Sequence, residues 1–576
     1  MEKRLLVAIF LTFLVLYGYQ ILVLKPAQEA AAGRRAAQAG ATTPAGAVPA
    51  RGTAAVSPAA VAPERSVPVV APVAAEPLVA EGVEREIVVD TQAIRAVFSN
   101  RGARLRSWRL KSFLDLQRRP QELVPQYVPA GSTRPFDLTV DDEGTTSRLR
   151  EILFRVTGGE NDGRVDATRK GRTVAFEYRD SGGLAVRKTF SFEPRSFIVK
   201  VSVTVEAGGR PMNPTVLWGP GLGDQVPGAE TSRYSLKPEG IIVRGDKVQR
   251  LPSSELAKQP VQEGDVLAAG VDDQYFIAVA LPVRTLRVEY APLSLPGPAG
   301  GDAKQRTELV GFGVRQAQTM SDMRFFFGPK DFDVLQGVDT RLVRVINFGM
   351  FDFLAVPLLR SLKWINVRVG NYGWSIIILT FLINAIMFPL RHKSMVSMRK
   401  MQELQPEVKR IQDRYGKLKA TDPERQKMNT EMMSLYKEKG VNPASGCVPM
   451  LLTLPVLFAF YSLLSAAIEI RGEPFIFWIK DLSSRDPYYV TPVLMGASQL
   501  AQQWMTPSSA DPVQQKMMLM MPLVFTFMFL WMPSGLVVYW LFSNVLAIGQ
   551  QYITNHVIGP PPPPARPAAE RRVKSR

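Results

Sequence analysis

The sequence predicts a polytopic α-helical membrane protein, an N-terminal anchor plus a five-helix core, that carries an antiparallel β-sandwich domain outside the cytoplasm. Three observations lead to this fold class. Long apolar runs recur after about residue 370, short alternating runs fill 85–337, and Lys and Arg gather beside the apolar runs. The formal charge of +18 over 576 residues therefore indicates a membrane rather than nucleic acid.

The chain begins with a predicted transmembrane anchor at residues 1–24. Here "MEKR" precedes about twenty residues without a charge, which at 1.5 Å rise cover the roughly 30 Å hydrocarbon core of a bilayer. A cleaved signal peptide is the alternative, but its apolar part is normally about 7 to 15 residues long. Lys3 and Arg4 predict that the N-terminus stays in the cytoplasm.

Two segments of different composition follow the anchor. Residues 25–84 are rich in Ala and Pro with few large side chains, so they predict a flexible linker. Residues 85–337 contain short runs such as "AVRKTFSF", "FIVKVSVTVEA" and "QYFIAVALP", which predict an antiparallel β-sandwich. Because this domain follows an anchor with a cytoplasmic N-terminus, we expect it outside the cytoplasm.

The composition argues against an enzyme. The only histidines, His392 and His556, fall outside the predicted β domain, and the single Cys447 has no partner for a disulfide or a Cys-based zinc site. Asp272 and Asp273, in "GVDDQY", are more typical of a solvated turn than of a catalytic pair. We predict no catalytic residues, no metal and no cofactor.

An amphipathic helix is predicted over residues 338–371. Its apolar stripe consists of Leu342, Val345, Ile346, Gly349, Met350 and Phe353. A helix in the protein core is the alternative. The position directly before a spanning run favours a helix that lies in the outer membrane interface.

The five-helix core is predicted over residues 372–556. Its spanning segments are expected at about 373–390, 447–468, 488–505, 517–532 and 534–552. The loop 391–440 and the tail 557–576 are rich in Lys and Arg, whereas the loop 469–487 balances the two signs. The positive-inside rule therefore predicts that both termini are cytoplasmic.

The loop 391–440 is predicted to form a cytoplasmic helical hairpin, because apolar residues recur at spacings of three and four on both sides of "TDPER". Pro406 either kinks the first arm or starts its main segment. Soft apolar side chains on this basic hairpin are Met395, Met398, Met401, Met428, Met432 and Met433. They suit adaptable contact with apolar segments, and a solvated hairpin that merely links two spans is the alternative.

Polar residues form stripes on three of the predicted spanning helices. They are Thr380, Asn384, Gln499, Gln502, Gln503, Tyr539, Trp540, Ser543 and Asn544. Hydrogen bonds between helices are one explanation, and a water-accessible cavity is the other. The number of polar groups, with several prolines in short spans, favours a cavity that holds polar polypeptide while its apolar part enters the bilayer.

These segments resemble the YidC/Oxa/Alb family of membrane protein insertases in its Gram-negative form. The resemblance rests on "NYGWSIIILTFLINAIMFPL", "TEMMSLYKEKGVNPASGCVPML", "DLSSRDPYYVTPVLMG" and "DPVQQKMMLMMPLVFTFMFLWMPSGLVVYWLFSN". It implies an inner-membrane insertase without covalent chemistry, whose hydrophilic groove receives nascent membrane proteins, alone or beside the Sec translocon. It also implies that the β domain is periplasmic.

The resemblance also assigns individual positions. It implies an arginine where this chain has Asn384, a substrate-facing role for Thr380, and two aromatic positions at Tyr539 and Trp540. We expect a neutral, hydrated groove in which Asn384 is a hydrogen-bonding substitute. Arg391, seven residues on and on nearly the same helix face, is the alternative source of charge.

Two other functions remain as alternatives: an assembly scaffold or foldase that acts only with the translocon, and a small-solute transporter. The five predicted core spans contain no Asp or Glu, which argues against a proton or cation relay. The expected partners are nascent membrane proteins, the lipid bilayer, the Sec translocon and the ribosome. The basic hairpin and tail attract phosphate without reading a nucleic-acid sequence, or simply orient the chain.

Overall fold

The structure, a computed structural model, describes residues 76–558 except 116, 130, 160–161, 224–236, 282–284, 296–306, 317–321, 416–423, 442–447 and 506–511. The predicted anchor, most of the predicted linker, nearly all of the predicted tail and Cys447 lie outside the described residues. The chain divides into two units. Residues 74–507 and 522–576 form one, and residues 1–73 and 508–521 form the other.

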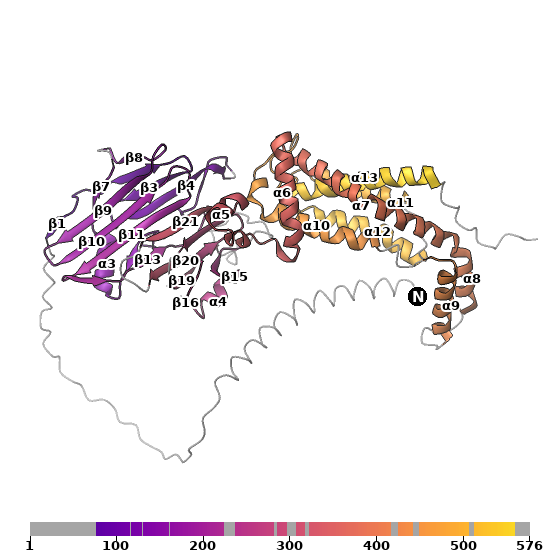
Figure 1. Cartoon of the computed structure of the whole chain (residues 1–576), viewed down its shortest axis with the longest axis horizontal. Coiled ribbons are helices and arrows are strands. Elements are labelled where there is room, and N and C mark those ends of the chain that lie inside the picture. Colours follow the sequence, from indigo (N-terminus) through magenta and orange to yellow (C-terminus); the bar gives the residue numbers. More distant parts are fainter. Residues whose placement is uncertain are drawn as a thin grey trace, which may run out of the picture. The chain divides into compact units, whose positions relative to one another are not determined.

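The β domain is built from three sheets (Figure 1). Its strands are β1 (Pro77–Val79), β2 (Glu86–Asp90), β3 (Ile94–Ser99), β4 (Arg104–Leu114), β5 (Pro120–Glu122), β6 (Leu138–Thr139), β7 (Arg155–Thr157), β8 (Arg164–Asp166), β9 (Arg172–Asp180), β10 (Leu184–Phe192), β11 (Ile198–Ala207), β12 (Arg210–Met212), β13 (Thr215–Trp218), β14 (Glu239–Arg244), β15 (Lys247–Leu251), β16 (Val261–Gly264), β17 (Ala268–Asp272), β18 (Phe276–Leu281), β19 (Leu286–Leu295), β20 (Thr307–Gln316) and β21 (Met323–Pro329).

The 11-stranded sheet runs β1-β9-β10-β11-β21-β18-β17-β14-β15, with β12 beside β11 and β7 beside β9. The two five-stranded sheets run β16-β19-β20-β13-β6 and β5-β4-β3-β2-β8. Among the described strand pairs only β2 and β8 run parallel, so the prediction of antiparallel sheets holds with one exception.

Alternation of side chains gives the sandwich its core. Along β10, Leu184, Val186 and Phe190 are buried at every second position, as expected for a strand with one face on the core. Large aromatic rings fill the space between the sheets, and Trp218 and Phe327 stack with ring centroids 3.9 Å apart. Aromatic packing of this kind adds to the burial of apolar area.

The β domain begins before the predicted boundary at residue 85. β1 pairs with β9, with Pro77 opposite Asp180, so the last residues of the predicted linker 25–84 belong to the domain. A strand of three residues is too short to show an alternating pattern. The composition of the preceding residues therefore placed it in the linker.

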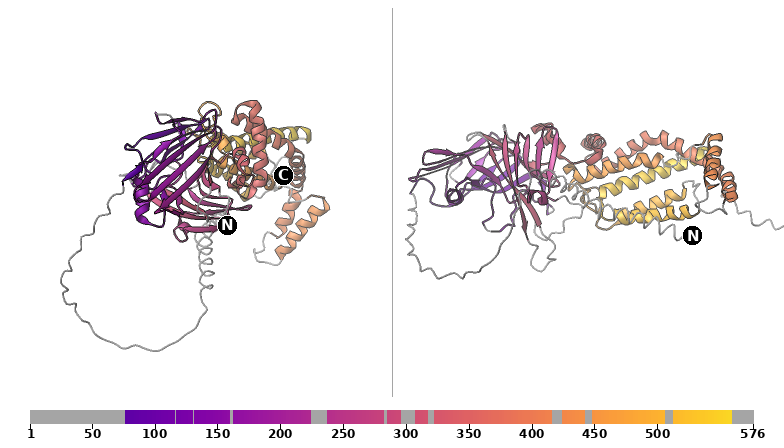
Figure 2. Two further views of the ribbon diagram at one scale, coloured as in Figure 1. Left: turned by 60° about the vertical axis from the view of Figure 1, so that its left-hand side comes forward. Right: turned by 90° about the horizontal axis from the view of Figure 1, so that it is seen from below.

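The helices are α3 (Glu143–Glu151), α4 (Ser253–Leu256), α5 (Phe332–Val338), α6 (Asp352–Val369), α7 (Tyr372–Glu403), α8 (Gln405–Tyr415), α9 (Glu424–Glu438), α10 (Val448–Ala466), α11 (Val490–Met505), α12 (Pro512–Phe529) and α13 (Ser534–Ile558). Short 3-10 helices are η2 (Leu342–Val345), η3 (Gly349–Phe351) and η5 (Ile468–Ile470). Figures 1 and 2 show α7, α10, α11 and α13 running alongside one another.

The single amphipathic helix predicted over 338–371 is wrong in its first half. The predicted stripe is divided among η2, η3 and the start of α6, where Phe353 lies. Gly349, the first residue of η3, has a φ of 69°, in the left-handed region that interrupts an α-helix. The α-helix begins only at Asp352 and ends at Val369, and the following Gly370 has a φ of 70°, which is typical of a helix C-terminus.

α7 also crosses a predicted boundary, since it continues without interruption from Tyr372 through Arg391 to Glu403. The predicted hairpin 391–440 therefore begins inside the same helix as the predicted span. Two described helices are long and apolar enough to cross a membrane, 372–403 and 534–554, and two shorter apolar helices span 453–466 and 519–529. The number of spans stays a prediction.

Candidate functional site

Polar side chains of α7 first satisfy their own helix. Thr380 is fully buried, and its hydroxyl donates to the carbonyl oxygen of Ile376 at 2.6 Å. The Asn384 amide nitrogen donates to the carbonyl oxygen of Thr380 at 2.8 Å. The Thr380 hydroxyl and one N–H of the Asn384 amide are thus paired within their own helix.

Arg391 joins this set from two turns further along α7. Its Nη1 donates to Oδ1 of Asn384 at 2.6 Å, and its Nη2 donates to Oγ1 of Thr453 on α10 at 3.3 Å. We call Thr380, Asn384, Arg391 and Thr453 the polar cluster. Arg391, the alternative source of charge, thus contacts Asn384, and whether the groove is neutral or charged stays a prediction.

The cation of the polar cluster has only neutral partners. Arg391 makes no ion pair with a carboxylate of the described residues. A charge in an apolar helix bundle is costly unless it is solvated or paired, and polar or ionisable groups there usually mark a functional site. The guanidinium of Arg391 therefore remains able to form an ion pair with an anionic group.

A second polar contact joins α11 to α13. The Asn544 amide nitrogen donates to Oγ of Ser498 at 3.0 Å and to the carbonyl oxygen of Met495 at 3.3 Å. Oε1 of Gln499 is buried and accepts no hydrogen bond from a described residue. The other predicted polar residues here, all half-buried, are Gln502, Gln503 and Ser543. At Asn544 the contact is a hydrogen bond between helices, the alternative that was less favoured.

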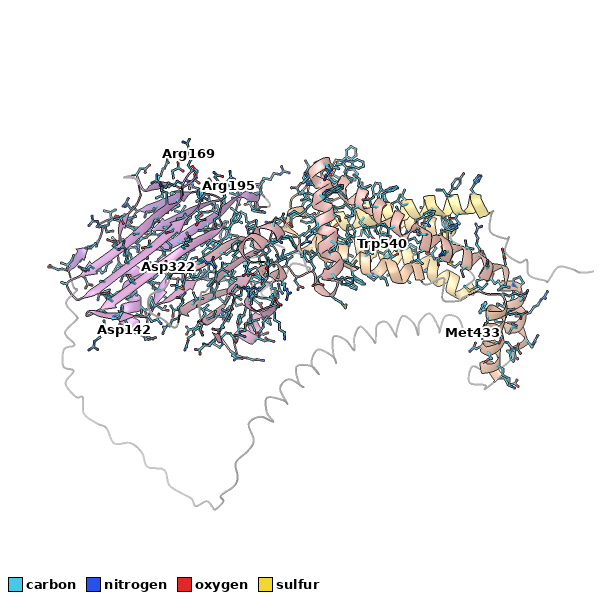
Figure 3. The ribbon with its side chains drawn as sticks, in the orientation of Figure 1. Asp142, Arg169, Arg195, Asp322, Met433 and Trp540 are labelled. Carbon is cyan, nitrogen blue, oxygen red and sulfur yellow. The ribbon has the colours of Figure 1, made fainter. Side chains whose placement is uncertain are left out.

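The neighbouring aromatic residues of α13 contact different helices. The buried Tyr539 ring stacks on Phe460 of α10, with centroids 4.2 Å apart. Trp540, labelled in Figure 3, lies 5.8 Å from the ring of Phe525 and 5.3 Å from that of Phe529 on α12. Tyr539 therefore faces the polar cluster side of α13, and Trp540 faces α12.

The two arms of the predicted hairpin are joined by polar contacts. The Tyr415 hydroxyl donates to Oε1 of Glu431 at 2.7 Å, and Pro406 lies in the first turn of α8, so it starts that arm rather than kinking it. Met433, labelled in Figure 3, is 58% exposed. The other predicted methionines, all half-buried, are Met395, Met398, Met401, Met428 and Met432.

Sequence reasoning missed Thr453 and Ser498 as members of the polar contacts. Thr453 is a single hydroxyl in an apolar stretch, with no polar neighbour three or four residues away. Ser498 lies four residues before Gln502, so its helical spacing to a predicted residue could have identified it. Within the described residues, no group of three or more His, Cys, Asp or Glu side chains could hold a metal ion.

Comparison with known proteins covers nearly the whole chain. Residues 86–361 match the family described as YidC periplasmic domain, and residues 364–560 match the family described as 60Kd inner membrane protein. A membrane protein insertase YidC of Citrifermentans bemidjiense is 36% identical over 575 residues, which cover 97% of this chain and 100% of that protein. A relative of the same name from Geotalea daltonii is 34% identical, with 96% and 99% covered.

Among solved structures, an active YidC insertase with its first transmembrane domain resolved is 19% identical and covers 83% of this chain and 95% of its own. Its TM-score of 0.34 is too low to add to the sequence comparison. Sequence identities above 30% over almost the full length of these relatives establish the family of the chain. The chain belongs to the YidC family of membrane protein insertases, inner-membrane proteins with a periplasmic β-sandwich domain.

Proposed function

We propose that this insertase moves nascent inner-membrane proteins from the cytoplasm into the bilayer through a hydrophilic path along α7, α10 and α13, with no covalent step. The observation that carries the proposal is the Arg391 guanidinium, held on Asn384 and Thr453 and unpaired with any described carboxylate. Polar groups inside a helix bundle lower the free energy of a polar segment that must pass the apolar layer.

The polar cluster supplies two kinds of contact to such a segment. Asn384 and Thr453 offer neutral hydrogen bonds, and Arg391 attracts carboxylates, which it can accept in a bidentate manner. Tyr539 would complete the path from α13, because its ring stacks on Phe460 of α10, the helix that also carries Thr453. We assign Gln499, Gln502, Gln503, Trp540, Ser543 and Asn544 to its flanks.

The proposal extends to topology and partners. An N-terminal anchor and five core spans would leave both termini in the cytoplasm, as the distribution of Lys and Arg predicts. The hairpin methionines, with Met433 exposed, would receive apolar segments before they enter the path. The insertase would act alone on short substrates and beside the Sec translocon and the ribosome on others.

Reconstitution tests the proposal. The purified chain in liposomes should protect a newly synthesised single-span protein from added protease above the level of empty liposomes. Arg391→Gln should lower the protected fraction several-fold for a substrate with acidic residues in its translocated tail. Arg391→Lys should keep part of it, because it retains the charge but loses the planar double donor.

The matched control is Arg360→Gln, which removes a cation from α6, outside the polar cluster, and should leave insertion unchanged. Asn384→Leu should lower insertion of both acidic and neutral tails, because it removes the acceptor that positions the guanidinium. If Arg391→Gln inserted every substrate as well as the parent, the charged path would be wrong. Protection that required added translocon would favour a scaffold.

A further inference from the structure

Exposed aromatic side chains gather on the loop between α10 and α11. Phe477 is 82% exposed and Tyr488 is 68% exposed. Phe477 and Tyr489 have φ values of 51° and 57°, a left-handed conformation that costs an ordinary residue about 1–2 kcal/mol. The fold therefore keeps backbone strain at Phe477, whose side chain is mostly exposed, and at Tyr489, whose side chain is 37% exposed.

The rings are held on a rigid frame. The buried carboxylate of Asp486 accepts hydrogen bonds from Nε1 of Trp478 at 3.0 Å, from the backbone amide of Tyr488 at 3.0 Å, and from the backbone amide and hydroxyl of Thr491 at 2.8 and 2.7 Å. Burial opposes ionisation, but these hydrogen bonds lower the pKa of Asp486. The Trp478 ring stacks on Phe477 and meets Tyr488 edge-on.

Acidic side chains of this loop point inward. Asp481 accepts hydrogen bonds from the Ser483 backbone amide and from the hydroxyls of Ser483 and Ser484. Glu469 is buried beside the Lys363 ammonium at 3.3 Å, and Glu473 is half-buried. Most of the negative charge of the loop is therefore used within the protein.

Two basic side chains of the loop point outward, while the third, Arg471, is half-buried and donates to Oε1 of Gln121 at 2.8 Å. Lys480 and Arg485 are exposed, and neither makes an ion pair with a described carboxylate. The sequence balances the two signs over 469–487, but the surface that the loop presents is positive and aromatic. A partner that fits it has anionic groups above an apolar layer.

The loop is fixed at the outer end of α7. The Asn371 side chain caps α7 and donates to the carbonyl oxygens of Pro474 and Phe475, each at 3.2 Å. The Phe475 ring lies directly against Gly373, where a Cβ would meet ring carbon at 2.0 Å. The half-exposed Trp374 ring is 5.7 Å from Phe475. The aromatic loop thus lies at the N-terminal end of α7, a helix long and apolar enough to cross a membrane, and Trp and Tyr concentrate at membrane interfaces.

We propose that residues 475–489 anchor the protein in the outer leaflet, with the rings of Phe477, Tyr488 and Tyr489 at the boundary of headgroups and acyl chains. Lys480 and Arg485 bind lipid phosphate, so anionic phospholipids are preferred. The proposal rests on α7 crossing the bilayer, as in the proposed function, but not on insertion itself.

A fluorescent label tests the anchor in the full chain. In a Cys447→Ser background, Phe477→Cys carries an environment-sensitive nitrobenzoxadiazole, and the protein is placed in phosphatidylcholine liposomes with or without phosphatidylglycerol. We expect blue-shifted emission and quenching by headgroup-region spin-labelled lipid at least twofold stronger than for a label at Arg169→Cys on the β domain (Figure 3). Phosphatidylglycerol should strengthen the quenching.

A double variant tests whether the two basic side chains cause the preference for anionic lipid. Lys480→Gln with Arg485→Gln should abolish the effect of phosphatidylglycerol while the label stays quenched, because the rings remain. Emission equal to that of the Arg169→Cys control in both lipids would overturn the anchor. A blue shift that appeared only with added translocon would show that the loop binds protein rather than lipid, which would also overturn it. A quenched label in liposomes that fail to insert substrate would overturn the proposed function alone.

Discussion

Lys188 shows how one residue can decide a local structure. It occupies an inward position of β10, is almost fully buried, and donates to the carbonyl oxygens of Gly102 at 2.6 Å, Ala103 at 3.3 Å and Phe136 at 2.8 Å. All three acceptor residues have left-handed backbone, with φ values of 68°, 45° and 68°. The ammonium thus holds together two strained loops that apolar packing alone would not fix.

Replacement of Lys188 by Met should lower the unfolding free energy of the β domain by about 2–4 kcal/mol, because three buried carbonyl oxygens lose their donor. Burial lowers the pKa of Lys188 to about 7. Between about pH 7 and pH 10 the unfolded chain keeps the proton that the folded chain has released, so the stability of the parent rises with pH. Denaturant unfolding followed by tryptophan fluorescence should show this rise, and Lys188→Met should lack it.

Glycine allows the close approach of two helices. At Gly496 of α11 an added Cβ would meet Oγ1 of Thr526 on α12 at 1.9 Å, and that hydroxyl is already bonded to the carbonyl oxygen of Pro522 at 2.7 Å. The β-branched threonine has little freedom to move away. α11 and α12 can therefore cross this closely only because Gly496 has no side chain.

Gly496→Ala should destabilise the helical core by about 1–3 kcal/mol, the usual cost of overpacking. Gly549→Ala is the matched control, since nothing lies within 4 Å of the added Cβ in α13, and alanine there should be neutral or stabilising by up to about 1 kcal/mol. Thermal unfolding in detergent compares the two. Equal melting temperatures for the Gly496→Ala and Gly549→Ala variants would contradict this prediction, because α11 and α12 would then move apart without loss of stability.

Strand β18 shows how far an element could be read from the sequence. It was predicted from a run in an alternating domain, yet all six of its residues are buried. Ala278 and Ala280 face the sandwich core, while Ile277 and Val279 face a second core shared with the helices. A strand covered on both faces has no alternation to read. The polar cluster could be predicted only in part. The helical spacing of Thr380 and Asn384 is visible in the sequence, but Thr453 lies on another helix, and no spacing in the sequence relates it to them.

Two hydrophobic cores organise the whole molecule. The first fills the sandwich, around residues such as Phe98 and Trp108. The second runs from the other face of the large sheet, through Leu335 and Leu342, to the helices, where it includes Leu463. The β domain therefore covers apolar surface of the helical part without contributing a residue to the polar cluster.

Deletion of residues 86–330 should lower the melting temperature of the remaining helices, because Leu335 and Leu342 lose their cover. Insertion of short substrates should largely survive, since the polar cluster lies entirely on α7 and α10. The protease-protection assay checks this. Complete loss of insertion by a truncated chain that still unfolds cooperatively would favour a scaffold role for the β domain.

Pro389 lies between the two linked side chains of α7, Asn384 and Arg391. A proline inside a helix lacks its N–H and leaves the carbonyl four residues earlier, here that of Ala385, without its usual donor. The hydrogen bond from Arg391 to Asn384 therefore bridges the part of α7 in which Pro389 removes a backbone hydrogen bond. A substrate carboxylate that draws the guanidinium away would break this hydrogen bond, and α7 would then be free to bend at Pro389.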